Sequence, residues 1–436
     1  MATKILHKSL LMLSLVSAMA VPILSVLGYR TGIGPSVVLC FVSLALYCMG
    51  HSFLKQFAFT VWVFAFVSVS MFHPAAFGSW FGFDLKTLIV PLIQVIMFGM
   101  GTTLSLRDFR RIFAMPWPIF VGTLSQFIIM PFTSFAIATL FGFEPEIAAG
   151  VVLIGSVPGG VASNVMCYLA RGNVALSVTM TACTTLVSPF MTPLMMKLLA
   201  GKLVPIHFVS MMLSIVDMIV VPVFAGLIAN RILYSASRWA NRMGPLSAMA
   251  IGSLLLAVGT VLFGNRLPGV LISMRNGIVI GAALIGVVAM AKWIISLVLK
   301  KPSGWIDKAL PIFSMAGICA IIAIITAQSS EKLLTVGLRL FAAAVFLNAT
   351  GYLLGYWFAR VGRLDESSCR AVAFEVGMQN GGMASGLAMN VLKSPFTALA
   401  PAIFGPWQNI SGSILANWWH RRDIPTRKEG GSNESP

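Results

Sequence analysis

Residues 157–193 read VPGGVASNVMCYLARGNVALSVTMTACTTLVSPFMTP, and this stretch decides the fold of the chain. It places Pro158, Gly159 and Gly160 within an apolar run that is long enough to span a bilayer. A break in a membrane-spanning helix frees backbone N–H and carbonyl groups in hydrocarbon, where they are tolerated only if they line a cavity or bind something. The stretch therefore predicts a discontinuous transmembrane helix at a binding site, although glycine in membrane helices also permits close helix packing.

The composition agrees with a membrane protein. Of the 436 residues, 58% are hydrophobic and 10% are charged, and the mean hydropathy is +0.91, whereas about a quarter of the residues in soluble domains are charged. An ordinary soluble enzyme is therefore excluded. The net charge of +17 is spread between apolar runs without a dense basic tract, which favours loops beside membrane spans over nucleic-acid binding. The six cysteines include no CxxC pair, so neither disulfides nor a metal site is indicated.

The apolar runs predict an all-α polytopic membrane protein with fourteen spans. The second and thirteenth runs are the weakest, so twelve or thirteen spans are the alternatives. The predicted spans lie at 9–28, 35–54, 56–74, 87–106, 115–140, 146–170, 174–200, 205–230, 246–264, 276–299, 309–328, 336–359, 371–392 and 396–419.

The distribution of positive residues predicts the orientation. Most of the 30 Lys and Arg residues fall in the termini and in the loops that share a side with the N-terminus, and such positive loops favour the cytoplasm. We therefore expect a multi-pass protein of the cell inner (plasma) membrane with both termini cytoplasmic and a disordered tail over 421–436. The alternative for the first run is a cleaved signal peptide, because Lys4 and Lys8 precede it.

The fourteen spans divide into two sets of seven at about residue 201, and an odd number per set would invert the second set relative to the first. Inverted repeats are common in secondary transporters. The sixth run of each set is interrupted, in the first by 158–160 and in the second by Gly377, Gly381 and Gly382. Paired breaks at matching positions point to a binding site between the two halves.

The acidic residues narrow the position of that site. Of 13 Asp and Glu residues, only Asp217 and Glu375 lie well within apolar runs, where an ionisable group is costly unless it has a partner or a function. Glu375 is followed by Gln379 and Asn380, so carboxylate and amide oxygens gather beside the second break. Oxygen ligands of this kind suit a hard cation such as Na⁺.

The first half offers a matching polar set. Ser163, Asn164, Ser177 and Thr181 follow the first break, and Gln126 lies in the preceding span. Ser177 and Thr181 are four residues apart and therefore share one helix face. Isolated hydroxyls in membrane helices commonly bond back to the carbonyl four residues earlier, but a cluster beside a break favours a binding role.

Five motifs together resemble the bile acid:sodium symporter family. They are the stretch 157–193, FGMGTTL (98–104), LNATGYLLGY (347–356), FEVGMQN (374–380) and WQNISGSILA (407–416). The resemblance implies an inverted-repeat secondary transporter with a ten-helix core, in which a panel domain faces a core domain and two broken helices cross behind a substrate cavity. About four additional helices lie outside that core. The implied parts are an additional N-terminal helix pair (1–55), the first part of the core (56–232), an inserted helix pair (233–303), the second part of the core (304–420) and the tail (421–436).

The resemblance also implies two Na⁺ sites at the crossing and a substrate site beside them, with Na⁺ as the coupling ion and no other cofactor. The first Na⁺ site would use Ser163, Asn164, Ser177, Thr181 and Glu375. The second would use Gln126, Glu375, Gln379 and the backbone carbonyls of Val376 and Met378. Substrate would lie near Val161, Asn380 and Asn409, where broken-helix N-termini offer N–H groups to an anion. The helix breaks themselves would comprise Pro158, Gly159, Gly160, Gly381 and Gly382.

Asp217 lies outside both ligand sets. It could pair with Lys292 within the added region, or it could carry a proton and so couple transport to H⁺.

Sequence and resemblance together predict a sodium-coupled symporter of an organic anion, such as pantoate, a 2-oxo acid or a bile-acid-like compound, that works by alternating access. Its partners would be this small anion, sodium ions and the lipid bilayer, without nucleic acid. The alternatives are a proton-coupled organic anion transporter and a non-transporting membrane substrate sensor. An intramembrane enzyme is disfavoured because the five His residues lie near span ends and neither HExxH nor GxSxG occurs.

Overall fold

The computed structural model describes residues 2–51, 54–235, 242–266, 268–298 and 306–422, which are helical almost throughout. Nine helices in this part of the chain are long and apolar enough to cross a membrane, and shorter apolar helices accompany them. Each of the fourteen predicted runs overlaps a helix or a broken helix, which confirms an all-α polytopic membrane protein. Residues 423–436 of the predicted tail lie outside the described residues.

The helices up to residue 200 are α1 (Ala2–Val26), α2 (Arg30–Gly50), α3 (Ala58–Phe72), α4 (Ile89–Thr103), α5 (Leu106–Ala114), α6 (Pro116–Leu140), α7 (Pro145–Ser156), α8 (Ala162–Leu169) and α9 (Val174–Ala200). A short hairpin of β1 (Ser79–Trp80) and β2 (Phe83–Asp84) links α3 to α4. Its turn residues, Phe81 and Gly82, both have positive φ angles, as a two-residue hairpin turn of the I′ type requires.

The helices after residue 200 are α10 (Phe208–Ile215), α11 (Val221–Tyr234), α12 (Met243–Phe263), α13 (Gly269–Ser273), α14 (Arg275–Lys292), α15 (Ile306–Gln328), α16 (Ser330–Val361), α17 (Glu366–Gly377), α18 (Gly381–Asn390) and α19 (Pro395–His420). A π-helical turn, η4 (Val216–Val220), joins α10 to α11 without a break in direction and carries Asp217. The short 3-10 and π segments η1 (Leu54–Phe57), η2 (Pro74–Phe77), η3 (Leu85–Leu88), η6 (Gly264–Arg266) and η7 (Trp293–Val298) flank other helices.

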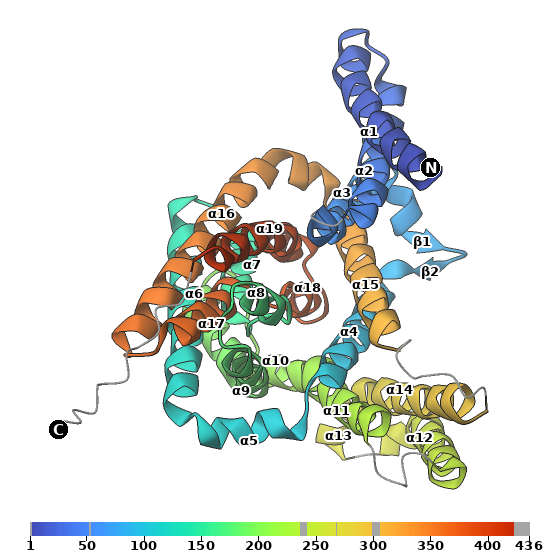
Figure 1. The fold of residues 1–436 in the computed structure, drawn as a ribbon, viewed down its shortest axis with the longest axis vertical. Helices are drawn as coiled ribbons and strands as arrows, with labels where there is room; N and C mark the ends of the chain where they lie inside the picture. Colours follow the sequence, from blue (N-terminus) through green and yellow to red (C-terminus); the bar gives the residue numbers. More distant parts are fainter. Residues whose placement is uncertain (1, 52–53, 236–241, 267, 299–305, 423–436) are drawn as a thin grey trace, which may run out of the picture.

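One layer of the molecule is a row of helices, seen at the right of Figure 1. Neighbours in the row contact one another in the order α1, α2, α3, α15, α4, α11, α14, α12. We call the middle four helices, α3, α15, α4 and α11, the panel. The pair α1 and α2 extends one end of the panel, and the pair α12 and α14 extends the other end. Both pairs lie outside the core that the family resemblance implies. Many apolar side chains of α1 and α12 are exposed, as expected for helices that face lipid tails.

The contacts also show which helices of the two halves correspond in the panel. α3 packs on α15 and α11 packs on α4, so α3 and α11 occupy equivalent places in the panel. The added pair precedes α3 in the first half, whereas in the second half it follows α11. The two predicted sets of seven runs therefore do not match one another run by run, because the position of the extra pair along the chain differs between the two halves.

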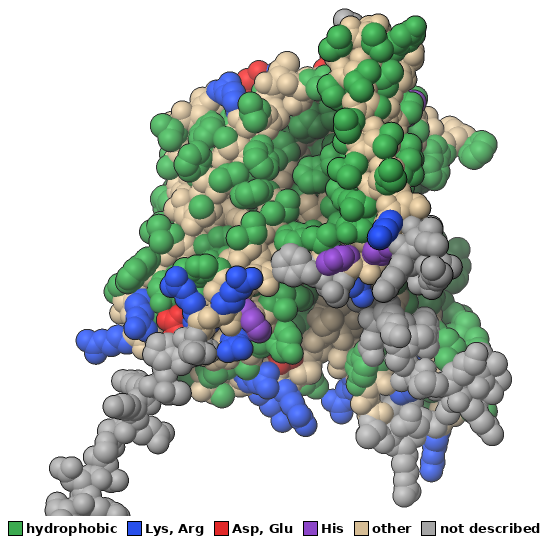
Figure 2. All heavy atoms as spheres, turned by 45° about the horizontal axis from the view of Figure 1, so that its top comes forward, with side chains coloured by type: hydrophobic (Ala, Val, Ile, Leu, Met, Phe, Trp, Pro, Cys, Tyr) green, Lys and Arg blue, Asp and Glu red, His purple; other side chains and the backbone are tan. Residues whose placement is uncertain are grey.

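The other layer contains α6, α7, α8, α9, α16, α17, α18 and α19, with the broken helices α7–α8 and α17–α18 at its centre (Figure 1). Figure 2 shows a broad band of apolar side chains with Lys and Arg side chains gathered below it. This pattern is typical of a membrane-embedded bundle.

Candidate functional site

The two broken helices meet at their unwound segments and pair their backbones there. Gly160 N–H donates to the carbonyl of Met378 at 2.8 Å, and Asn380 N–H donates to the carbonyl of Pro158 at 2.9 Å. Gly159 and Gln379 form an antiparallel bridge between these bonds. Each break therefore satisfies backbone groups that the other break leaves free, which is what non-helical backbone at membrane depth requires.

Glycine is required at this crossing because other residues approach its backbone too closely to leave room for a side chain. A Cβ atom on Gly159 would collide with the carboxylate of Glu375, and one on Gly160 would lie 2.8 Å from the carbonyl oxygen of Gln379. The structure places Pro158, Gly159 and Gly160 within the first break, between α7 and α8.

The second break differs from its prediction. Gly377 is the last residue of α17, and Gly381 and Gly382 form the first turn of α18. None of the three lies in the unwound segment, which comprises 378–380. The reason is the Asn380 side chain, which accepts the N–H of Met383 at 3.0 Å and so caps α18 at this point.

The five side chains predicted for the first Na⁺ site lie together. Glu375 is fully buried, and its Oε2 accepts hydrogen bonds from Ser163 Oγ at 2.6 Å and Thr181 Oγ1 at 2.9 Å. The Asn164 side-chain oxygen accepts Ser177 Oγ at 2.7 Å and lies 3.4 Å from Thr181 Oγ1. Residues from α8, α9 and α17 thus concentrate carboxylate, amide and hydroxyl oxygens at one point behind the crossing.

The other carboxylate oxygen of Glu375, Oε1, differs from the rest of this cluster in its hydrogen bonding. Among the residues that the structure describes, Oε1 has no hydrogen-bond partner although it is buried. A buried ionised carboxylate is very costly unless it is paired. A hard cation at Oε1 would supply the missing charge with ligands of the preferred type, so the donor set fits Na⁺.

The two amide side chains predicted for the second Na⁺ site, those of Gln126 and Gln379, form a cluster at the crossing. Gln126 Nε2 donates to Gln379 Oε1 at 2.7 Å and to the carbonyl of Val157 at 2.8 Å. The carbonyl of Val376 accepts the Gln379 side-chain amide, and the carbonyl of Met378 accepts Gly160 N–H. Both carbonyls therefore line the crossing and already hold one hydrogen bond each.

Two residues that sequence reasoning did not assign hold the second break in place. Gln408 of α19 pairs with both backbone groups of Gln379, accepting its N–H at 2.8 Å and donating to its carbonyl at 2.9 Å. Asn348 of α16 donates to the carbonyl of Gly377 at 2.8 Å. Both lie in motifs quoted above, but only their distance to the break identifies this role.

Asp217 lies away from the crossing and is not paired with Lys292. Its Oδ1 accepts the backbone N–H of Gly277 in α14 at 2.6 Å, and Gln94 of α4 contacts its carboxylate and its carbonyl. Lys292 instead donates to the carbonyl of Ile232 at 2.6 Å, at the end of α11. The predicted ion pair is therefore wrong, because Asp217 contacts the start of α14 whereas Lys292 lies at the other end of that helix.

A cavity of about 630 Å³ lies between the panel and the other layer. Val161, Asn380 and Asn409, the three residues expected at the substrate, all line it, together with Gly381 and Gly382. The starts of α8 and α18 border this space, so their partial positive charges favour an anion there. The cavity also reaches Thr103 and Tyr234, which lie at the ends of α4 and α11.

On the side of the crossing away from this cavity, α18 packs closely against α4 and η4. A side chain on Gly386 of α18 would collide with Ile93 of α4 and with Met218 of η4, so the two layers are in close contact at this point. Access from the cavity past Gly386 would require the layers to separate.

A bundle of membrane-spanning helices in two layers, with two broken helices that cross beside a cavity, defines a multi-pass membrane transporter. The chain belongs to the sodium bile acid symporter family. The model of that family matches residues 90–267, and the chain is 32% identical over 377 residues to the uncharacterized sodium-dependent transporter YocS of Bacillus subtilis, with 86% of this chain and 94% of that protein covered. The family membership expected from the five motifs is thereby confirmed.

Other relatives come from plants and animals. The probable chloroplastic sodium/metabolite cotransporter BASS1 of Arabidopsis thaliana is 29% identical over 372 residues, covering 85% of this chain and 75% of that protein. The ileal sodium/bile acid cotransporter of Homo sapiens is 28% identical over 370 residues, covering 80% of this chain and 85% of that protein. The similarity therefore extends over most of each chain rather than over one motif.

Proposed function

We propose that this protein is a symporter that couples the inward movement of Na⁺ to the uptake of an organic anion. The single observation that carries the proposal is the fully buried Glu375 carboxylate at the helix crossing, with one oxygen bonded to two hydroxyls and the other without a partner among the described residues. Two Na⁺ ions would use the sets named for them, 163, 164, 177, 181 and 375 in one and 126, 375, 376, 378 and 379 in the other. They would neutralise Glu375 and order the two breaks.

The substrate of the proposed symporter is a small organic carboxylate or sulfate, of the pantoate, 2-oxo acid or bile-acid-like kind. The relatives named as sodium/metabolite and sodium/bile acid cotransporters support this class. The anion would bind near Val161, Asn380 and Asn409, which line the cavity in front of the crossing. Sodium and anion would raise each other's affinity, because both bind to the same ordered arrangement of the broken helices.

The location and the domain division are part of the proposal. We place the protein in the plasma membrane with both termini in the cytoplasm, supported by the basic side chains that gather at one end of the bundle (Figure 2). Residues 56–232 and 304–420 form the transport core, whereas 1–55 and 233–303 add helix pairs to its panel. In this orientation the cavity faces the cytoplasm. The close packing of Gly386 against Ile93 and Met218 would close the route to the outer side.

The test needs no substrate. Thermal stability of the purified protein is compared in NaCl and in matched KCl, for wild type, Glu375→Gln and the control Glu331→Gln, whose carboxylate is exposed at the start of α16. A ligand that binds only the folded state raises the melting temperature, so we expect sodium-specific stabilisation in wild type and Glu331→Gln but not in Glu375→Gln. In KCl, Glu375→Gln should melt no lower than wild type, because it removes an unpaired buried charge.

Sodium-specific stabilisation that persists in Glu375→Gln would place the cation elsewhere and refute the assignment. Sealed vesicles then separate the classes of function. A symporter accumulates a radiolabelled anion when an inward Na⁺ gradient is imposed, whereas a sensor binds the anion without accumulating it. Uptake that follows a pH gradient in the absence of Na⁺ would favour proton coupling instead.

A further inference from the structure

A second cavity, of about 870 Å³, lies on the face of the transport core between α16 and α19. We call it the α16–α19 groove. Leu353 and Trp357 of α16 and Ile414 and Trp418 of α19 line it, and their side chains are 47–58% exposed. Because these apolar residues belong to membrane-spanning helices, the groove faces lipid.

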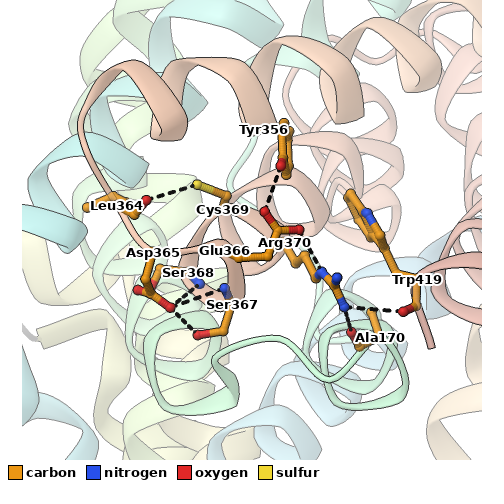
Figure 3. A network of polar contacts seen from close by, with 10 residues as sticks. All are labelled: Ala170, Tyr356, Leu364, Asp365, Glu366, Ser367, Ser368, Cys369, Arg370 and Trp419. Carbon is orange, nitrogen blue, oxygen red and sulfur yellow. Dashed lines mark hydrogen bonds and ion pairs between the residues drawn. The ribbon is translucent and has the colours of Figure 1, made fainter. Parts of the chain in front are cut away.

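The basic end of the groove carries one cation that no carboxylate balances among the described residues that line it. Glu366 and Arg370 form an ion pair at 3.0 Å, and Glu366 also accepts the Tyr356 hydroxyl at 2.7 Å. Arg370 is further occupied by the carbonyls of Ala170 and Trp419, as Figure 3 shows. Arg422 is the cation without a carboxylate partner among these residues. It is exposed, and its guanidinium lies 3.7 Å from the centre of the Trp418 ring.

The length of the groove matches one leaflet. Trp407 of α19 and Arg422, two residues beyond the end of α19, both line it. The helical part alone, from Trp407 to His420, corresponds to about 20 Å. One leaflet with its headgroup region is about as thick.

The floor of the groove contacts the second helix break. Asn348 and Tyr352 line it, and Ser411 donates to Asn348 Oδ1. Asn348 in turn donates to the carbonyl of Gly377 at 2.8 Å. An occupant of the groove therefore packs against the side chains that hold the end of α17.

We propose that the α16–α19 groove binds one anionic phospholipid, whose phosphate pairs with Arg422, whose acyl chain lies along the aromatic wall and which stabilises the break after Gly377. The charge of Arg422, the lipid-facing wall and the leaflet-length groove all fit this occupant. The inference does not depend on sodium coupling, since none of the described residues that line the groove belongs to either sodium set.

The test compares melting temperatures in nanodiscs of phosphatidylcholine with and without phosphatidylglycerol. In wild type, phosphatidylglycerol should raise the melting temperature by about 2–4 °C. Ala349→Trp, which fills the groove, and Arg422→Gln should both lose this shift. The matched controls are Ala136→Trp, on the exposed face of α6, and Arg421→Gln, beside Arg422; both should retain it.

Two further measurements keep the result decisive. Native mass spectrometry should show one phosphatidylglycerol retained by wild type and none by Arg422→Gln, which covers the case that Ala349→Trp does not fold. Glycerol phosphate, which has the headgroup chemistry but no acyl chains, should give no shift. An equal phosphatidylglycerol shift in Ala349→Trp and Ala136→Trp, or a full shift with glycerol phosphate alone, would overturn the proposal.

Discussion

Replacing Gln408 by alanine tests whether the second helix break is held by α19. The Gln408 side chain makes two hydrogen bonds to the backbone of Gln379, at 2.8 and 2.9 Å, and both residues are buried. Each buried backbone group that loses its partner costs about 1–3 kcal/mol. Gln408→Ala should therefore lower the free energy of unfolding by about 2–5 kcal/mol after partial relaxation.

The assay is thermal unfolding of the purified protein in nanodiscs, with Asn409→Ala as the control. Asn409 makes only a hydrogen bond within its own helix, to the carbonyl of Gly405, among the contacts described, so its loss should leave the melting temperature nearly unchanged. Gln408→Ala should melt several degrees lower and need a higher NaCl concentration for half-maximal stabilisation, because the carbonyls at the crossing shift with Gln379. Equal melting of the two variants would refute the reasoning.

The remaining predictions concern residues away from the crossing. Asp217→Asn should leave sodium-specific stabilisation intact, because Asp217 contacts Gly277 rather than the cluster at Glu375; loss of that stabilisation would contradict the site assignment. Arg370→Met should destabilise the protein by about 3 kcal/mol in chemical denaturation, because it leaves Glu366 without its buried ion-pair partner; an unchanged midpoint would speak against this. Asp365→Ala should cost about 1 kcal/mol, because the Asp365 carboxylate caps α17 through the N–H groups of Ser367 and Ser368 (Figure 3).

Asp365 also carries a pH dependence. Partial burial alone would raise the pKa of Asp365, but hydrogen bonds from Ser367 and Ser368 outweigh it and hold the pKa below its ordinary value. A depressed folded-state pKa stabilises the protein above the unfolded value of about 4, and this contribution is lost as the pH falls through the folded value. The stability difference between wild type and Asp365→Ala should therefore shrink in that acidic window; a constant difference would contradict the cap.

Much of the candidate site could be predicted because its polar residues can be recognised within single apolar runs of the sequence. Oxygen-bearing side chains are scarce in apolar spans, so Glu375 and the cluster at Ser163 stand out from their surroundings, and the proline and glycines at 158–160 identify the first break. Gln408 and Asn348 could not be assigned in the same way. Each lies 29 positions from the backbone groups that it bonds, and their polar side chains gave no sign of which segment they would face.

The sequence by itself determined that this chain forms membrane-spanning helices, where they lie and which two are broken, because burial in hydrocarbon depends on the length and polarity of each run. Only the tertiary structure decided how the runs assemble. It placed the added pairs α1–α2 and α12–α14 at opposite edges of the panel, and it separated Asp217 from Lys292. It also paired the backbones of Gly160 and Met378 across the crossing. These are contacts between surfaces distant in the chain, and they are selected by packing geometry, which no single run encodes.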